Sequence, residues 1–93
     1  MTLYVLFTSE DAVSRYNAAI AAVRLVALVP RELRPRIITA GPNIVLTVTA
    51  PADGTAADAI AAVRLAVCDP VLARWRLALY SESPLDRNEG DEE

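Results

Sequence analysis

The sequence predicts an α+β domain with the element order βαβ-βαβ, in which two copies of one unit build a single four-stranded antiparallel sheet. The main observation is an internal repeat with an offset of 40 residues. Residues 19–25 and 59–65 share the heptapeptide Ala-Ile-Ala-Ala-Val-Arg-Leu, and 13 of the 40 aligned positions are identical. Two further observations are the clean alternation of side chains in residues 44–49 and a proline after each apolar helical stretch.

The first copy, residues 1–40, begins with a strand at residues 2–8, which are rich in aromatic and β-branched side chains. Ser9 is placed to cap a helix, because the acids that follow it suit the first turn of a helix dipole. We expect this helix to run to Val29, where Pro30 stops it. A second strand is expected at residues 36–40.

The second copy, residues 41–80, opens with a turn of Gly, Pro and Asn and continues as a strand at residues 44–50. Thr55 followed three residues later by Asp58 is a capping-box pattern, so we expect a second helix to start there. Pro70 closes that helix, and residues 73–80 form the last strand.

These two units resemble the ferredoxin-like fold over residues 2–80. The resemblance implies the strand order 4-1-3-2, with both helices on one face of the sheet. Parallel βαβ crossovers are right-handed, which lets two such units interleave in one sheet. The fold hosts many unrelated functions, so it implies no activity by itself.

The chain separates into a body and an acidic tail. Its 93 residues are enough for one domain with a modest core, which we place at residues 1–80. Residues 81–93 contain one Arg and six acids, so we expect a tail that is either a solvated segment or an interaction element. The acids are Glu82, Asp86, Glu89, Asp91, Glu92 and Glu93.

Composition limits the cellular compartments and the classes of partner that we expect for the protein. A lone Cys68 excludes an internal disulfide and suits a reducing cytoplasm. The longest apolar stretch is interrupted by Arg24 and is too short for a membrane span. The acidic overall balance, a net charge of −3, counts against nucleic acid as a partner.

The helices are predicted to be apolar on more than one side. In the first helix, the side chains expected to face the sheet are those of Tyr16, Ala19, Ile20, Val23 and Ala27, and in the second helix those of Ile60, Val63 and Val67. Apolar residues then remain on the outer side, where a partner or a second copy is expected to cover them. This predicted helical surface consists of Arg24, Leu25, Leu28, Arg64 and Leu65.

A second predicted surface is the sheet face that no helix covers. If Ile44, Leu46 and Val48 point inward, the repeat places the alternate residues of the other strands outward. Three interpretations remain open: a dimer surface, edge arginines that discourage aggregation, and a platform for an anionic partner. The residues of this predicted face are Leu3, Val5, Phe7, Val45, Arg36, Arg74, Arg76 and Tyr80.

Groups for catalysis are sparse. The sequence has no His, no paired Cys and no glycine-rich phosphate loop, and its acids lie mostly at expected helix ends. Cys68, late in a helix, is read as a packing residue and not as a nucleophile. We therefore expect no catalytic residue, metal or cofactor.

The first functional hypothesis is a small, non-catalytic, self-associating module for assembly or protein binding, with a homodimer as the expected state. A phage-type inhibitor or adaptor that uses its acidic tail against a basic site is the second. The third is a small-molecule enzyme of the dimeric α+β-barrel type, with a pocket between two sheets.

Overall fold

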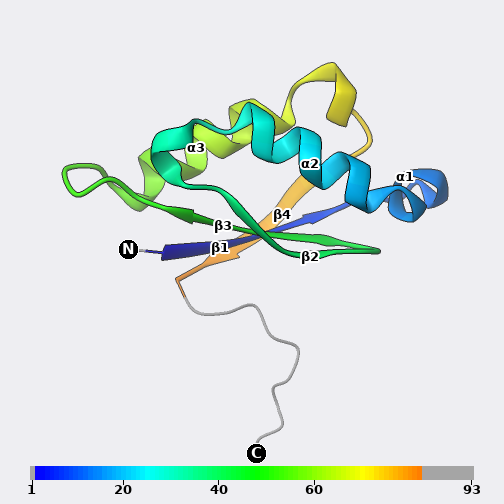
Figure 1. Cartoon of the computed structure of the whole chain (residues 1–93), viewed down its shortest axis with the longest axis horizontal. Helices are drawn as coiled ribbons and strands as arrows, with labels where there is room; N and C mark the ends of the chain where they lie inside the picture. Colours follow the sequence, from blue (N-terminus) through cyan, green and yellow to red (C-terminus); the bar gives the residue numbers. More distant parts are fainter. Residues whose placement is uncertain (1, 83–93) are drawn as a thin grey trace, which may run out of the picture.

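Residues 2–82 of the chain are described by a computed structural model. The strands are β1 (Thr2–Thr8), β2 (Arg36–Ala40), β3 (Ile44–Thr49) and β4 (Arg76–Ser81). The α-helices are α1 (Ala12–Tyr16), α2 (Ala18–Leu28) and α3 (Ala56–Val67), and the short 3-10 turns are η1 (Arg31–Leu33) and η2 (Pro70–Leu72). Figure 1 shows α2 and α3 over one face of the sheet, which we call the inner face; the opposite face is the open face.

The four strands form one sheet in the order β2-β3-β1-β4. Read from the β4 edge, this order is 4-1-3-2, and all neighbouring strands are antiparallel. The two long helices are the connections between β1 and β2 and between β3 and β4. The α+β class and the four-stranded antiparallel sheet are therefore as predicted, with three α-helices within residues 2–82 in place of two.

The extra helix arises because the first predicted helix is broken at Asn17. The Asn17 side chain donates a hydrogen bond to the carbonyl of Val13 (3.1 Å), and its backbone leaves the helical conformation at φ −101° and ψ 28°. Asn side chains compete with helical backbone bonds in this way. The cap is also displaced: Asp11, and not Ser9, accepts the hydrogen bond of the Ser14 backbone N–H (2.9 Å).

In the second copy, the capping box at the start of α3 is confirmed. The Thr55 hydroxyl accepts from the Asp58 backbone N–H (3.1 Å), and the Thr55 N–H donates back to the Asp58 carboxylate (3.3 Å). The last strand starts later than expected because η2 and the turn after it occupy the preceding residues; the Trp75 N–H still bonds to the Leu72 carbonyl (2.9 Å). No helix within residues 2–82 has the length and apolar character that crossing a membrane requires.

Both edge strands contain an irregularity in their pairing. In β2 the pairing passes from Ile37 directly to Thr39, so Ile38 is an extra residue opposite β3. In β4 it passes from Leu77 to Leu79, so Ala78 is an extra residue opposite β1. Such bulges bend the strand and interrupt the regular row of backbone donors and acceptors.

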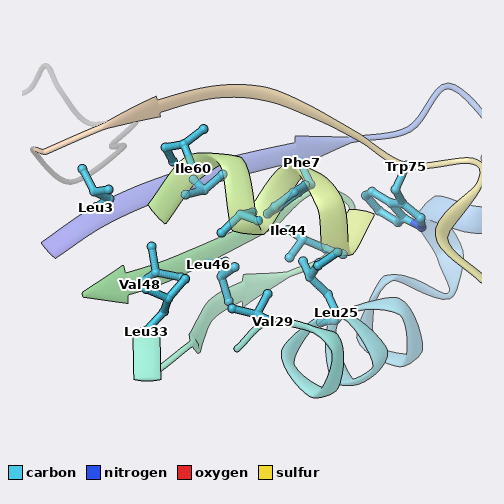
Figure 2. Packing of buried hydrophobic residues seen from close by; sticks show 14 of the residues in the cluster. Leu3, Phe7, Leu25, Val29, Leu33, Ile44, Leu46, Val48, Ile60 and Trp75 are labelled. Atoms are coloured by element: carbon cyan, nitrogen blue, oxygen red, sulfur yellow. The ribbon is translucent and has the colours of Figure 1, made fainter. Parts of the chain in front are cut away.

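The core lies between the inner face of the sheet and the two long helices, as Figure 2 shows. Its largest fully buried side chains include Phe7 and Leu3 from β1, Leu46 from β3 and Leu25 from α2. Trp75, the only tryptophan of the sequence, is 7% exposed and belongs to the same cluster. Burial of these side chains supplies the main driving force for folding.

Candidate functional site

An apolar row crosses three strands on the open face of the sheet. Leu6 of β1 pairs with Val45 of β3 on one side and with Leu79 of β4 on the other. Residues directly opposite in a ladder point to the same face, so these three side chains are neighbours. Leu6 and Val45 are half-buried and Leu79 is exposed, and none of the helices in the described chain covers them (Figure 1).

The predicted placement of Leu3, Val5 and Phe7 on this open face is wrong. All three belong to the core, with 1% exposure or less. The register pairs Val5 with Leu46 and Phe7 with Ile44, so odd residues of β1 share the inner face with even residues of β3. The 40-residue offset gave them the opposite parity, and a shift of one residue reverses every side chain of a strand. Val45 does lie on the open face, as predicted.

The bulge at Ala78 changes the faces of β4 residues. Before it, Arg76 pairs with Thr8, which places Arg76 on the open face as expected. After it, Tyr80 pairs with Val5 and so lies on the inner side, contrary to the prediction, while Leu79 takes the open face. Arg74 lies outside the strand altogether.

At the opposite edge of the sheet, Arg36 pairs with Thr47, which places Arg36 on the open face as expected. The Thr47 hydroxyl donates to the Arg36 carbonyl at 3.5 Å, and Thr47 is 8% exposed although it is on the uncovered side. The Arg36 side chain is exposed and has no hydrogen bond or ion pair to the described residues.

The repeated heptapeptide is oriented differently in the two helices. Leu25 in α2 is 1% exposed, whereas Leu65, its copy in α3, is 77% exposed. The isoleucines show the reverse: Ile20 is 55% exposed and Ile60 is buried. Burial matches instead at an offset of 41, as for Leu25 and Ala66. One residue corresponds to a rotation of about 100° around a helix axis, which accounts for the difference.

This rotation determines which residues of the predicted helical surface are exposed. Leu25, predicted to be part of it, belongs to the core. The other four residues are exposed as predicted: Arg24, Leu28, Arg64 and Leu65. We expected an apolar stripe of the first helix to face the sheet, but its five residues are all exposed: Tyr16, Ala19, Ile20, Val23 and Ala27. Its three large side chains, together with Val13 of α1, make an exposed apolar surface that we call the α1–α2 stripe: Val13, Tyr16, Ile20 and Val23.

A hollow of about 320 Å³ lies beside the α1–α2 stripe, where α1 and α2 face the segment from η2 to β4. Its apolar lining includes Ile20, Val71 and Trp75. Among residues 2–82, its only charged lining residues are Arg24 and Arg74, both exposed. We call this the arginine hollow.

Beyond Arg74, a small polar cluster joins the end of β1 to the start of β4. Arg76 and Glu10 form an ion pair at 3.1 Å with both side chains largely exposed. The pKa of the Asp11 carboxyl is lowered below its ordinary value of 3.8, first because the Ser14 hydroxyl donates to it and then because the Ser14 backbone N–H does. The cluster therefore has the character of a helix cap with a surface ion pair.

Residues suited to metal binding or redox chemistry are not brought together in residues 2–82: no group of three or more His, Cys, Asp or Glu side chains is placed to hold a metal ion there. Cys68 is a free, exposed thiol at the end of α3. Of the acidic tail, Glu82 is exposed. The predictions for Asp86, Glu89, Asp91, Glu92 and Glu93 fall outside the described residues.

Comparison of the chain with protein-family models, with curated proteins and with solved structures gave no significant match. Two surfaces of the described residues are candidates for a functional site. These are the open sheet face with its apolar row and the helical side with its stripe and arginine hollow.

Proposed function

We propose that the protein is a small non-catalytic assembly module that pairs with a second copy of itself through the open face of its sheet. The observation that carries this proposal is the uncovered apolar row of Leu6, Val45 and Leu79. A contiguous patch of apolar side chains on the surface of a soluble protein marks an interaction site. Two sheets packed face to face would exclude water from both rows.

The row is also suited to pairing with itself. A two-fold axis parallel to the strands sets β3 of one copy over β1 of the other, so Val45 meets Leu6 twice. The same operation sets the β2 edge over the β4 edge. Arg36 then approaches the end of β4 in the second copy, where Glu82 follows directly after the strand. An isologous contact of this kind buries apolar surface and places opposite charges at its rim.

We further propose that the domain is ferredoxin-like. The element order β-α-β-β-α-β of the long elements and the strand order β2-β3-β1-β4 support this proposal. A free thiol at Cys68 is compatible with a reducing cytoplasm, which we propose as the location.

Sedimentation velocity over micromolar to millimolar concentration tests the self-association. We expect a dimer that Leu79→Glu dissociates, because a buried unpaired carboxylate at the apolar row is strongly unfavourable. Tyr80→Glu is the matched control: Tyr80 is the next residue, is exposed to a similar degree (44% against 46% for Leu79), and lies on the other face. A monomer throughout the range would refute the proposal.

A charge exchange tests the orientation of the two copies. Arg36→Glu and Glu82→Arg should each weaken the dimer. The double variant should restore it, because it exchanges the two charges and keeps one of each sign in the pair. A dimer that resists Leu79→Glu but dissociates with Val23→Glu would place the interface on the helical side and contradict the sheet interface.

A further inference from the structure

The arginine hollow is on the helical side of the molecule, away from the proposed sheet interface. One wall comes from α1 and α2 and includes Ile20, and the other comes from η2 and the residues before β4, including Val71. Trp75 lines the hollow while it is 7% exposed, so its ring is anchored in the core. The hollow thus combines an apolar lining with a rigid aromatic group, as peptide-binding surfaces do.

Its charge has one sign. Among residues 2–82, Arg24 and Arg74 are the only charged residues that line it, and neither guanidinium group forms an ion pair or a hydrogen bond within this range. Asp11 is near enough to Arg74 for the two charges to interact, but no carboxylate in residues 2–82 lies within 4 Å of either arginine. Two unpaired guanidinium groups beside apolar surface can bind carboxylates in bidentate geometry.

We infer that the arginine hollow binds an acidic peptide segment of a partner protein, one in which leucine-like side chains alternate with carboxylates. The apolar side chain would lie between Ile20 and Val71, and the carboxylates would pair with Arg24 and Arg74. A second copy fits this place poorly, because it would bring the same two positive charges with it. This inference goes beyond self-association, and it uses residues that the sheet interface does not.

Direct titration tests the inference on the full chain. The probe is the acetylated peptide Asp-Leu-Glu-Asp-Leu-Glu with a fluorescent label, and its control is the amide analogue Asn-Leu-Gln-Asn-Leu-Gln. Anisotropy measures binding, and the emission of Trp75, the only tryptophan, reports occupancy of the hollow. We expect the acidic peptide to bind, with affinity that falls as salt is added, and the amide analogue to bind at least about tenfold more weakly.

The repeat provides a matched set of variants. Arg24→Gln and Arg74→Gln should each weaken binding about tenfold, the effect of one lost charged hydrogen bond. Arg64→Gln should leave it unchanged, because Arg64 occupies the same place in the same heptapeptide but is outside the hollow. The dimer should persist in all three variants, which separates this test from that of the sheet interface.

Several results would overturn the inference. The first is a lack of binding up to millimolar peptide, and the second is equal binding of the amide analogue. Equal losses for Arg24→Gln and Arg64→Gln would show unspecific attraction. Replacing Asp91, Glu92 and Glu93 by their amides in the full chain should have no effect; a large gain in peptide affinity would instead make the chain's own acidic segment the occupant and exclude a separate partner.

Discussion

Leu25 and Leu65 occupy the same place in the repeated heptapeptide, but replacing each by Ala should give very different losses of stability. Leu25→Ala and Leu65→Ala make the same change within the same seven-residue sequence, so differences in helix propensity largely cancel. Leu25 is 1% exposed and packs in the core, whereas Leu65 is 77% exposed. Leu→Ala in a core costs about 2–5 kcal/mol, whereas exposed positions stay within about 0.5 kcal/mol.

Urea unfolding followed by circular dichroism measures both losses. With a slope of about 1 kcal/mol per molar for a small domain, Leu25→Ala should lower the unfolding midpoint by about 2 M or more. Leu65→Ala should shift it by about 0.5 M or less. The slope itself should change little if both variants unfold in two states.

The isoleucines of the same heptapeptide provide the reciprocal test. Ile60→Ala should be costly and Ile20→Ala nearly neutral, since Ile60 is buried and Ile20 is exposed. Equal losses within each pair, or larger losses at Leu65 and Ile20, would refute the one-residue rotation between the helices. Such losses would also show that the residues of the α1–α2 stripe are buried and do not lie on the surface.

Three smaller effects concern the ends of elements. Thr55→Ala should lower the free energy of unfolding by about 1 kcal/mol through loss of the capping box with Asp58, and Thr55→Ser should recover most of it in urea unfolding. The Asp11 cap should contribute fully above pH 3.8 and lose its contribution as the pH falls through a lower folded-state pKa; a midpoint at or above 3.8 in an NMR titration would contradict this. Glu10→Gln should cost no more than about 1 kcal/mol, because its ion pair with Arg76 is exposed, and a larger loss in the same urea assay would contradict that assignment.

Local sequence signals predicted the four strands and the two long helices, but not the break at Asn17 or the late start of β4. Thr55 and Asp58 form their capping box through neighbouring atoms alone, and the alternation of Ile44, Leu46 and Val48 requires only that one face of the strand be buried. In contrast, Asn17 could form a helix or break it, and its side-chain bond to the Val13 carbonyl accompanies the break.

The repeat does not predict which side of each helix or strand faces the core. Helix α2 is apolar on two sides, with Ala18 and Leu25 on one and Ile20 and Val23 on the other, so periodicity alone does not select which side is buried. The choice depends on how the helix meets the sheet. The extra residue at Ala78 is likewise a property of the β1–β4 pairing, and it determines which residues of β4 reach the candidate surface.

The bulges in the two edge strands affect how large an assembly can grow. When strands add edge to edge, each newcomer presents a fresh edge, so nothing limits the length of the resulting fibre. Ile38 and Ala78 interrupt both outer edges of this sheet, which makes such addition unfavourable. The proposed contact through the open face would consume the surface that makes it, so growth would end at two copies. With that proposed contact, the irregular edges would favour a closed pair over a polymer.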